Sequence, residues 1–187
     1  MLHPEKVLYG YSIGVFPMAH PGEDHRIYWY EPEMRGIVPL DNLKVSKSLK
    51  QTLRSGKFHV TINDSFEEVM RACAEREDTW ISEEIIQCYT ELFHIGHAFS
   101  FETRNNNNQL VGGLYGVALG RAFFGESMFF NERDASKVAL VHLVDWLKAN
   151  GFKLLDTQYI TPHLKTMGAI EIPQKEYLLL LESALQA

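Results

Sequence analysis

The stretch from Leu110 to Phe130 constrains the fold of this chain more than any other part. It is apolar almost throughout and is interrupted near Gly120-Arg121, so it predicts two strands joined by a short turn. Its only acid is Glu126, which has aromatic or sulfur-containing side chains on both sides. A carboxylate that leaves water without a partner is costly or stays protonated. We therefore expect Glu126 to reach solvent across the pleat or to meet a cation, and a bound ammonium group is one such cation.

The composition sets the class of protein. With 187 residues, 45% of them hydrophobic, the chain can bury a core and predicts one compact body or two closely packed ones. The 18 basic and 24 acidic residues give a net charge of -6, which argues against indiscriminate nucleic-acid binding but permits a local basic patch. We expect no membrane-spanning run and no signal peptide. Cys73 and Cys88 are expected to be buried thiols in a reducing cytoplasm.

Hydrophobic periodicity and turn signals predict an α+β layered domain. Several antiparallel strands come first, and a helix, a strand and further helices follow. Asp134 is expected to cap the helix that begins at Ala135. The expected helices are 4–11, 45–53, 65–76, 82–94, 135–149, 163–167 and 177–185, and the expected strands besides the central pair are 36–40, 58–62, 99–102 and 153–156.

A basic stripe is the first candidate for a functional surface. Its members recur every three or four residues, and no acid lies between Asp41 and Asp64. Such a stripe suits contacts with a phosphate backbone, although a plain solvated helix face is the alternative. The members are Lys44, Lys47, Lys50, Arg54 and Lys57.

A polar pair at the end of the last predicted strand is the second candidate. Asp156 and Gln158 are two residues apart, so in a strand they would point to the same side. A glutamine can orient a nucleophile but is a poor base, and Asp156 could supply the negative charge. The alternative is a structural pair that caps the next turn.

Other signals are weaker. Tyr28, Trp29, Tyr30 and Trp80 could stack on bases, but core packing is the commoner explanation for aromatic residues. The His94 to His97 spacing lacks further ligands, so we expect no metal site. The glycines between Gly112 and Gly116 precede a strand, which excludes a nucleotide-binding loop.

Motifs along nearly the whole chain, in order and spacing, resemble the bacterial leucyl/phenylalanyl-tRNA–protein transferases. They are Tyr11-Ser-Ile-Gly-Val-Phe-Pro17, Arg35-Gly-Ile-Val-Pro-Leu40, Val69-Met-Arg-Ala-Cys-Ala74, Thr79-Trp-Ile81, Leu110-Val-Gly-Gly-Leu-Tyr-Gly116, Gly125-Glu-Ser-Met-Phe129, Ala135-Ser-Lys137, Asp156-Thr-Gln158 and Met167-Gly-Ala169. Three features depart from the usual family pattern: a short N-terminus, Thr157 in place of the usual cysteine, and Met18 in place of a frequent tryptophan.

The resemblance implies a mixed sheet of the acetyltransferase-like (GNAT) type, with a small N-terminal part at 1–33 and the transferase domain at 34–187. It implies transfer of Leu, Phe or Met from aminoacyl-tRNA to proteins that begin with Arg or Lys, which marks them for degradation by the N-end rule. No cofactor, metal or membrane is implied, and we expect a cytoplasmic monomer.

The resemblance also implies roles for individual residues. Glu126 would lie near the α-ammonium of the donor, and Gln158, polarised by Asp156, would hydrogen-bond the attacking amine. The substrate-binding residues would be Leu114, Phe123 and Leu143 in an apolar pocket, Ser127 beside them, and Trp80 at the terminal adenosine. The basic stripe would bind tRNA.

Two other classes of function remain open at this point. An acyl-CoA-dependent N-acetyltransferase could share the fold, but the helix start Glu132-Arg-Asp-Ala135 is acidic and free of glycine, which discourages pyrophosphate. A non-catalytic module that binds tRNA or protein N-termini would not need Asp156 and Gln158 at a strand end.

Overall fold

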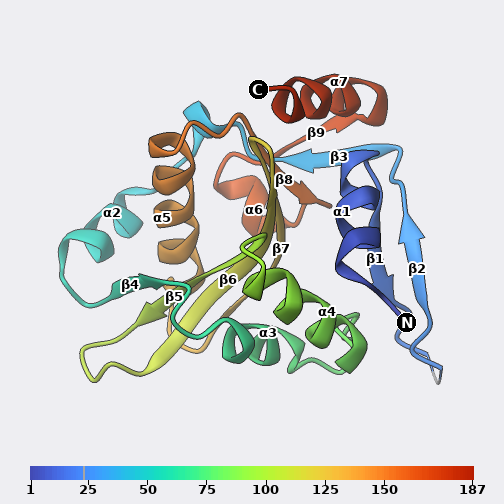
Figure 1. The fold of residues 1–187 in the computed structure, drawn as a ribbon. Helices are drawn as coiled ribbons and strands as arrows, with labels where there is room; N and C mark the ends of the chain where they lie inside the picture. The colour runs from blue at the N-terminus through green and yellow to red at the C-terminus, as the bar shows by residue number, and fades with distance from the viewer. Residues whose placement is uncertain (23) are drawn as a thin grey trace.

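A seven-stranded mixed sheet with helices on both faces forms the body of this computed structural model, which describes residues 1–22 and 24–187 (Figure 1). The strand order is β4-β5-β6-β7-β8-β3-β9, and β1 pairs with β2 in a separate hairpin. The strands are β1 Phe16–Ala19, β2 Ile27–Tyr30, β3 Met34–Ile37, β4 His59–Ile62, β5 Ala98–Arg104, β6 Leu110–Leu119, β7 Ala122–Phe130, β8 Leu154–Gln158 and β9 Ile170–Pro173. The helices are α1 Pro4–Ser12, α2 Lys47–Arg54, α3 Phe66–Ala74, α4 Glu83–His94, α5 Ala135–Ala149, α6 Pro162–Thr166 and α7 Gln174–Leu185, with a single 3-10 turn at Leu40–Asn42.

The predicted central hairpin is confirmed. Leu119 pairs with Ala122, so Gly120 and Arg121 form the turn, and Gly120 takes a left-handed conformation with φ of 55°. The next neighbour of β7 is β8, and this pair is parallel. This pairing ends where Phe124 lies opposite Asp156, so the rest of β7 and the end of β8 do not pair with each other. The sheet opens at this point.

A bulge in β7 places Glu126. Tyr115 pairs with Ser127 and Gly116 pairs with Gly125, so Glu126 is the additional residue between two consecutive pairs. A bulge of this kind bends the strand locally and redirects the side chain at that position. The bulge lies immediately after the point where β7 and β8 separate, and Glu126 consequently faces the opening in the sheet.

Two hydrophobic clusters, one on each face of the sheet, form the core. One cluster joins side chains of α1, α3, α4 and α7, and the other joins those of α2, α5 and α6. In Figure 1, α3 and α4 (green) cover one face and α5 (brown) covers the other. Val7, Tyr11 and Phe16 belong to the first cluster, so the expected packing of the N-terminal part on the rest of the chain is confirmed. The division at residue 33 stays a prediction.

Most predicted elements are confirmed, and α5 has the expected bounds. The cap at Asp134 is wrong: this residue has φ of 68° and makes no side-chain hydrogen bond to the helix start, and its carboxylate lies 3.9 Å from the Lys137 amine instead. The helix expected at 45–53 begins at Lys47, because Ser46 caps it by accepting a hydrogen bond from the Leu49 amide.

Other differences concern strands. The strand expected at 36–40 ends at Ile37, before the 3-10 turn. Strands β1, β2 and β9 were not predicted, because each has only four residues and none shows a clear alternation of buried and exposed positions. In the described part of the chain, no helix has the length and apolar character needed to cross a membrane. Cys73 and Cys88 are free and buried as expected, and burial raises the pKa of each thiol to about 12.

Candidate active site

A cavity of about 280 Å³ lies where β7 and β8 separate. Its apolar wall comes from β6, β7, α5, β8 and α6, and includes Leu114, Met128, Leu140, Leu143, Leu155 and Leu164. Its polar residues include Glu126, Ser127, Gln158 and His163. Arg76 and Trp80 also line it. An apolar cavity with a few convergent polar groups is the usual form of a small-molecule site.

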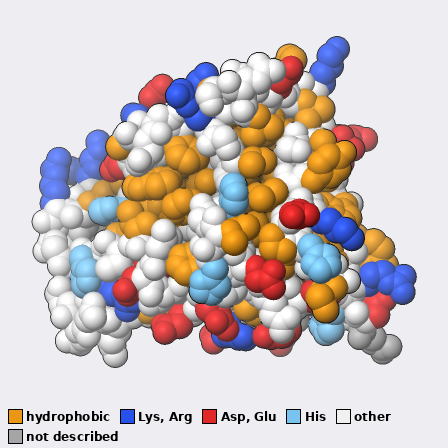
Figure 2. Space-filling view, viewed as in Figure 1, with side chains coloured by type: hydrophobic (Ala, Val, Ile, Leu, Met, Phe, Trp, Pro, Cys, Tyr) orange, Lys and Arg blue, Asp and Glu red, His pale blue; other side chains and the backbone are white. Residues whose placement is uncertain are grey.

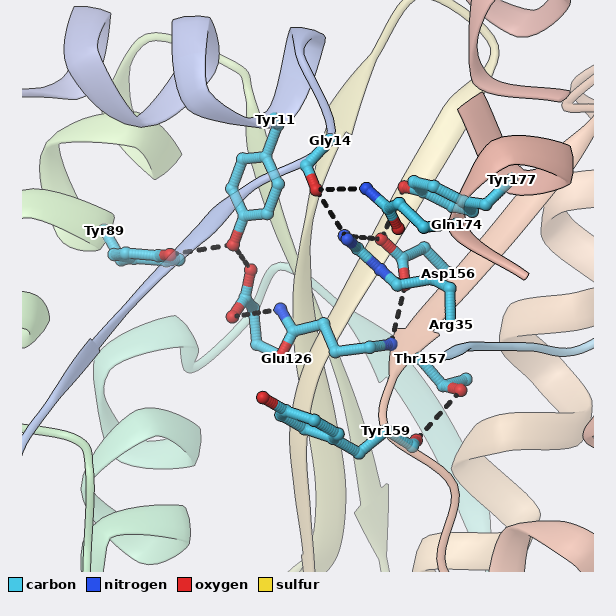
Figure 3. Close-up of polar contacts among 11 residues, drawn as sticks. Tyr11, Gly14, Arg35, Tyr89, Glu126, Asp156, Thr157, Tyr159, Gln174 and Tyr177 are labelled. Carbon is cyan, nitrogen blue, oxygen red and sulfur yellow. Dashed lines mark hydrogen bonds and ion pairs between the residues drawn. The ribbon is translucent and has the colours of Figure 1, made fainter. Parts of the chain in front are cut away.

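Glu126 reaches this cavity with neutral partners only. Its carboxyl group accepts a hydrogen bond from the Tyr11 hydroxyl and another, 3.3 Å long, from the Gln158 side-chain amide (Figure 3). The Tyr11 hydroxyl also lies 2.8 Å from the Tyr89 hydroxyl. Among the described residues, no cationic side chain pairs with Glu126. The cation that the sequence led us to expect is therefore not supplied by the described part of the chain.

This environment changes the ionisation of Glu126. Burial raises the pKa of the carboxyl group well above its ordinary value, the Gln158 hydrogen bond opposes the rise, and the negative charge of Asp156 adds to it. The raised pKa keeps the proton on this carboxyl group to a higher pH than in water. A cation beside it would reverse the shift, because a nearby positive charge favours the ionised form.

Asp156 has the opposite environment. Its two oxygens accept hydrogen bonds from Arg35, at 3.1 Å from Nε and 2.6 Å from Nη2, and the Tyr177 hydroxyl donates a third at 2.7 Å. Arg35 and Asp156 are both fully buried. Burial opposes the charge on Arg35, but the facing carboxylate outweighs it and raises the pKa of the guanidinium above its usual value.

Arg35 links several parts of the chain. Its remaining terminal nitrogen donates to the Gly14 carbonyl at 2.7 Å, and its guanidinium lies between the rings of Phe16 and Tyr177, at 4.7 and 4.3 Å from their centres. The Gln174 amide donates to the same Gly14 carbonyl. Figure 3 shows these groups converging from α7, β3 and the loop after α1. One buried ion pair thus joins the N-terminal part, the sheet and the last helix.

Gln158 was expected to be polarised by Asp156, but the two side chains make no hydrogen bond to each other. Asp156 Oδ1 accepts a hydrogen bond of 2.6 Å from the backbone amide of Gln158, and the Gln158 side chain turns to Glu126. The physical reason is that Gln158 has φ of 64°, so the alternation of the strand ends there. Gln158 lines the cavity, whereas Asp156 is not among its lining residues.

The other expected pocket residues divide into two groups. Leu114, Leu143, Ser127 and Trp80 line the cavity, and Met18 lines it as well. Phe123 is not among the lining residues: it is fully buried and packs near Phe99 and Phe152 in the core cluster under α5. For a large apolar residue such as Phe123, the sequence does not distinguish a position in the wall of a pocket from a position in the core behind it.

The basic residues lie on the surface, away from the cavity lining. All five are exposed, but only Lys47, Lys50 and Arg54 belong to α2, because Lys44 precedes the helix and Lys57 follows it. The Lys57 amine lies 3.6 Å from a Glu132 oxygen. Figure 2 shows Lys and Arg side chains at the edge of the molecule where α2 lies. Tyr28 and Trp29 are partly exposed, and the expected stacking role of these aromatic residues stays a prediction.

Sequence reasoning gave no role to several residues of this region. Arg35, Tyr11 and Tyr115 were recognised only as parts of motifs, and Tyr89 and Tyr177 only as members of expected helices. One signal was available: an arginine that enters an apolar strand needs a buried acid, and Asp156, after an apolar run, needs a buried base. The two lie 121 residues apart in the chain, so nothing in the sequence pairs them. In the described part of the chain, no group of His, Cys, Asp and Glu side chains could hold a metal ion.

Solved structures share this fold at low sequence identity. L-PGS from Bacillus licheniformis superposes with a TM-score of 0.52 and 8% identity over 83% of this chain and 65% of that one. A GCN5-related glucosamine N-acetyltransferase region of a fungal multi-domain GH3 beta-N-acetylglucosaminidase superposes with a TM-score of 0.53 and 11% identity over 75% of this chain and 20% of that one. The fold is therefore that of the GCN5-related acetyltransferases, as expected.

Sequence comparison narrows this class. The family model described as leucyl/phenylalanyl-tRNA protein transferase matches residues 37–182, and the model of that family's N-terminal domain matches residues 1–33. A leucyl/phenylalanyl-tRNA–protein transferase of Cereibacter sphaeroides is 52% identical over 94% of this chain and 82% of its own length. One of Afipia carboxidovorans is 51% identical over 98% and 82%. The chain belongs to the leucyl/phenylalanyl-tRNA–protein transferase family and is an aminoacyltransferase.

The buried ion pair gives a first prediction. Arg35→Met should lower the free energy of unfolding by about 3–5 kcal/mol, because it leaves the Asp156 charge buried without its partner. The double variant Arg35→Met, Asp156→Asn should recover at least half of that loss, because it removes both charges. Urea unfolding measures both. The control is Arg71→Met, which removes exposed ion pairs with Glu67 and Glu83 and should change stability little. A double variant less stable than Arg35→Met would contradict this account.

The raised pKa of Glu126 gives a second prediction. The folded protein holds a proton on Glu126 that the unfolded chain releases, so wild-type stability falls as pH rises above the unfolded value of about 4.3. Glutamine cannot ionise, so Glu126→Gln should melt at a higher temperature than wild type at pH 7. The gap should close as pH falls towards 4. Melting curves across this range test it, with the exposed Glu68→Gln as control. A gap that widens towards acid pH would show the opposite pKa shift.

Proposed function

We propose that this chain transfers Leu, Phe or Met from aminoacyl-tRNA to the α-amino group of proteins that begin with Arg or Lys, and so marks them for degradation by the N-end rule. The observation that carries the proposal is the position of Glu126 and Gln158, in hydrogen-bond contact, at the end of an apolar cavity. Both features of the site match the substrates. The donor has an apolar side chain that suits the cavity, and the amino groups of donor and acceptor lie beside a reactive ester, where Glu126 and Gln158 could bind them. We place the enzyme in the cytoplasm as a monomer.

The donor would bind through its side chain and its ammonium group. The apolar wall around Leu114 and Leu143 suits a Leu, Met or Phe side chain, for which the fit of each methylene is worth about 1–3 kcal/mol of discrimination. Glu126 would receive the donor's ammonium group. Its proton would leave as the cation arrives, because a nearby positive charge favours the ionised carboxylate. Trp80 lines the cavity and would contact the terminal adenosine, with Ser127 nearby.

The chemical step needs little beyond positioning. An aminoacyl ester is already activated, so an enzyme that holds the acceptor amine against the ester carbonyl gains most of the available rate. The amine releases one proton to water before attack, and its nitrogen lone pair then forms the new bond to the carbonyl carbon. The ester C–O bond breaks as the tetrahedral intermediate collapses, and the ribose oxygen takes the second proton from nitrogen. Gln158 would orient the amine through its side-chain carbonyl.

Asp156 would contribute through the backbone of Gln158. A non-glycine residue at positive φ costs on the order of 1–3 kcal/mol and persists only where its surroundings fix it. The 2.6 Å hydrogen bond from the Gln158 amide to Asp156 is such a restraint, and Arg35 and Tyr177 hold Asp156 in turn. In this proposal Asp156 aims Gln158 and does not polarise it.

The tRNA body would rest on the basic residues of the α2 region. They are exposed and all positively charged, in a protein whose net charge is -6. Phosphate contacts of this kind position a nucleic acid without reading its sequence. The order of preference among donors would then depend on the cavity alone.

One assay tests the function and the role of Gln158. Labelled Phe-tRNA and a peptide that begins with Arg should give labelled peptide only when this chain is present. Gln158→Ala should slow single-turnover transfer by about 10²–10³-fold, with tRNA affinity unchanged, because it removes an interaction that matters in the transition state. The exposed Gln87→Ala is the matched control. An inactive wild type would overturn the function, and a fast Gln158→Ala would overturn only the role of Gln158.

A second experiment tests the basic residues. Lys47→Ala with Lys50→Ala should weaken tRNA binding and reduce the slope of log affinity against log salt by about 0.7–0.9 for each phosphate that the protein no longer neutralises. The matched control is Lys6→Ala with Lys175→Ala, which removes the same charge from exposed positions elsewhere. Filter binding at several salt concentrations gives the slopes. Equal slopes for the two double variants would show that the basic residues of the α2 region are solvated and do not contact tRNA phosphates.

A further inference from the structure

Tyr159 presents an accessible aromatic ring to the cavity between β7 and β8. The residue is 46% exposed and is one of those that line the cavity. Figure 3 shows its ring extending in the direction of Glu126, which lines the same cavity. The proposed reaction uses the neighbouring Gln158 but not this ring. An aromatic face that reaches both a cavity and solvent is available to a flat ligand.

The backbone directs this ring into the site. In a continuous strand Gln158 and Tyr159 would point to opposite sides, but both line the cavity. The left-handed conformation of Gln158, with φ of 64°, accounts for the difference. The Thr157 hydroxyl donates a hydrogen bond of 3.2 Å to the Tyr159 carbonyl, and Gly36 packs so closely that a Cβ atom there would lie 2.8 Å from the same carbonyl oxygen. The position of Tyr159 is thus set by the protein before a ligand binds.

Strand β1 connects Tyr159 with Trp80. At the start of β1, the Phe16 ring meets the Tyr159 ring edge-on, with centres 5.7 Å apart. At the end of β1, the Ala19 amide donates a hydrogen bond of 3.1 Å to the Trp80 carbonyl. Met18 lies between these two contacts and lines the cavity together with both aromatic residues. The cavity therefore has an aromatic residue on either side of Met18, which has no ring of its own.

The donor of the proposed function ends in an adenosine, whose adenine is flat and uncharged. Stacking on an aromatic side chain is favourable for every base, because each base has a π-face. The guanidinium of an acceptor that begins with Arg could also lie on a tyrosine ring. Among the described residues that line the cavity, however, Glu126 is the only acid, and Arg76 would repel a second cation. The observations therefore favour adenine as the group that covers Tyr159.

We propose that the ring of Tyr159 stacks on the adenine of the donor's terminal adenosine and provides an aromatic surface in addition to Trp80. Stacking of this kind holds a base without reading its hydrogen-bonding edge. Because Tyr159 directly follows Gln158, the same turn of the backbone would place the adenosine and orient the attacking amine. This inference rests on the proposed function and names a further binding residue for its donor substrate.

Binding of stable analogues tests the stacking without catalysis. One probe is the amide-linked analogue of phenylalanyl-adenosine, and the other is the same compound with hydrogen in place of adenine. Tyr159→Ala should weaken affinity about 5–100-fold for the first probe and at most about twofold for the second, because only adenine loses a stacking partner. Tyr159→Phe keeps the ring and should bind both probes as wild type does. The control is Tyr9→Ala, which removes an exposed ring of α1 outside the cavity lining and should change neither affinity.

Steady-state transfer of Phe from Phe-tRNA to an Arg-initiated peptide separates the donor from the acceptor. Tyr159→Ala should raise KM for Phe-tRNA and leave KM for the peptide unchanged. A rise confined to the peptide would assign the ring to the acceptor's arginine and overturn this proposal. Equal losses for both analogues, no loss for either, or a Tyr159→Phe variant as weak as Tyr159→Ala would also overturn it. Each of these results leaves the proposed function intact, whereas an inactive wild type would overturn both.

Discussion

The ion pair between Arg35 and Asp156 is the interaction on which the rest of the structure depends. Neither charge reaches solvent, so each is tolerable only because the other is in place and because further hydrogen bonds satisfy both groups. The partners in those hydrogen bonds belong to the loop after α1 and to α7. Both α1 and α7 lie next to β3 (Figure 1). A buried pair of this kind gives little net stability against an apolar alternative. Its contribution here is geometric, because it fixes where β8 ends and how Gln158 leaves it.

The two carboxyl groups of the site have opposite environments, and this difference organises the proposed chemistry. Asp156 meets a permanent cation and two further donors, whereas Glu126 meets, among the described residues, a phenol and an amide. Two carboxyl groups in such different surroundings can take different tasks. A charged and fully paired Asp156 is suited to hold structure. A neutral Glu126 at a cavity is suited to receive a cation from outside.

The cavity itself follows from a strand pairing that stops early. Parallel pairing of β7 with β8 covers only three residue pairs, and the bulge at Glu126 follows directly. An opening in the middle of a sheet exposes residues from both of its faces, so Leu114 and Tyr115 can line the same cavity although they alternate along β6. The apolar side of the cavity joins the core under α5, and this is why Leu143 serves both core and pocket while Phe123 serves the core alone.

The sequence by itself determined the family, the α+β class, the central hairpin, helix α5 and the identity of several cavity residues. These features depend on local periodicity and on motifs whose order is readable along the chain. Only the tertiary structure decided that Arg35 pairs with Asp156, that Asp156 holds the backbone of Gln158, and that the Tyr115 side chain is fully buried. The reason is physical: a hydrogen bond or ion pair between residues far apart in the chain leaves no periodic trace. A single left-handed residue at a strand end likewise turns a side chain away from the side that strand alternation predicts.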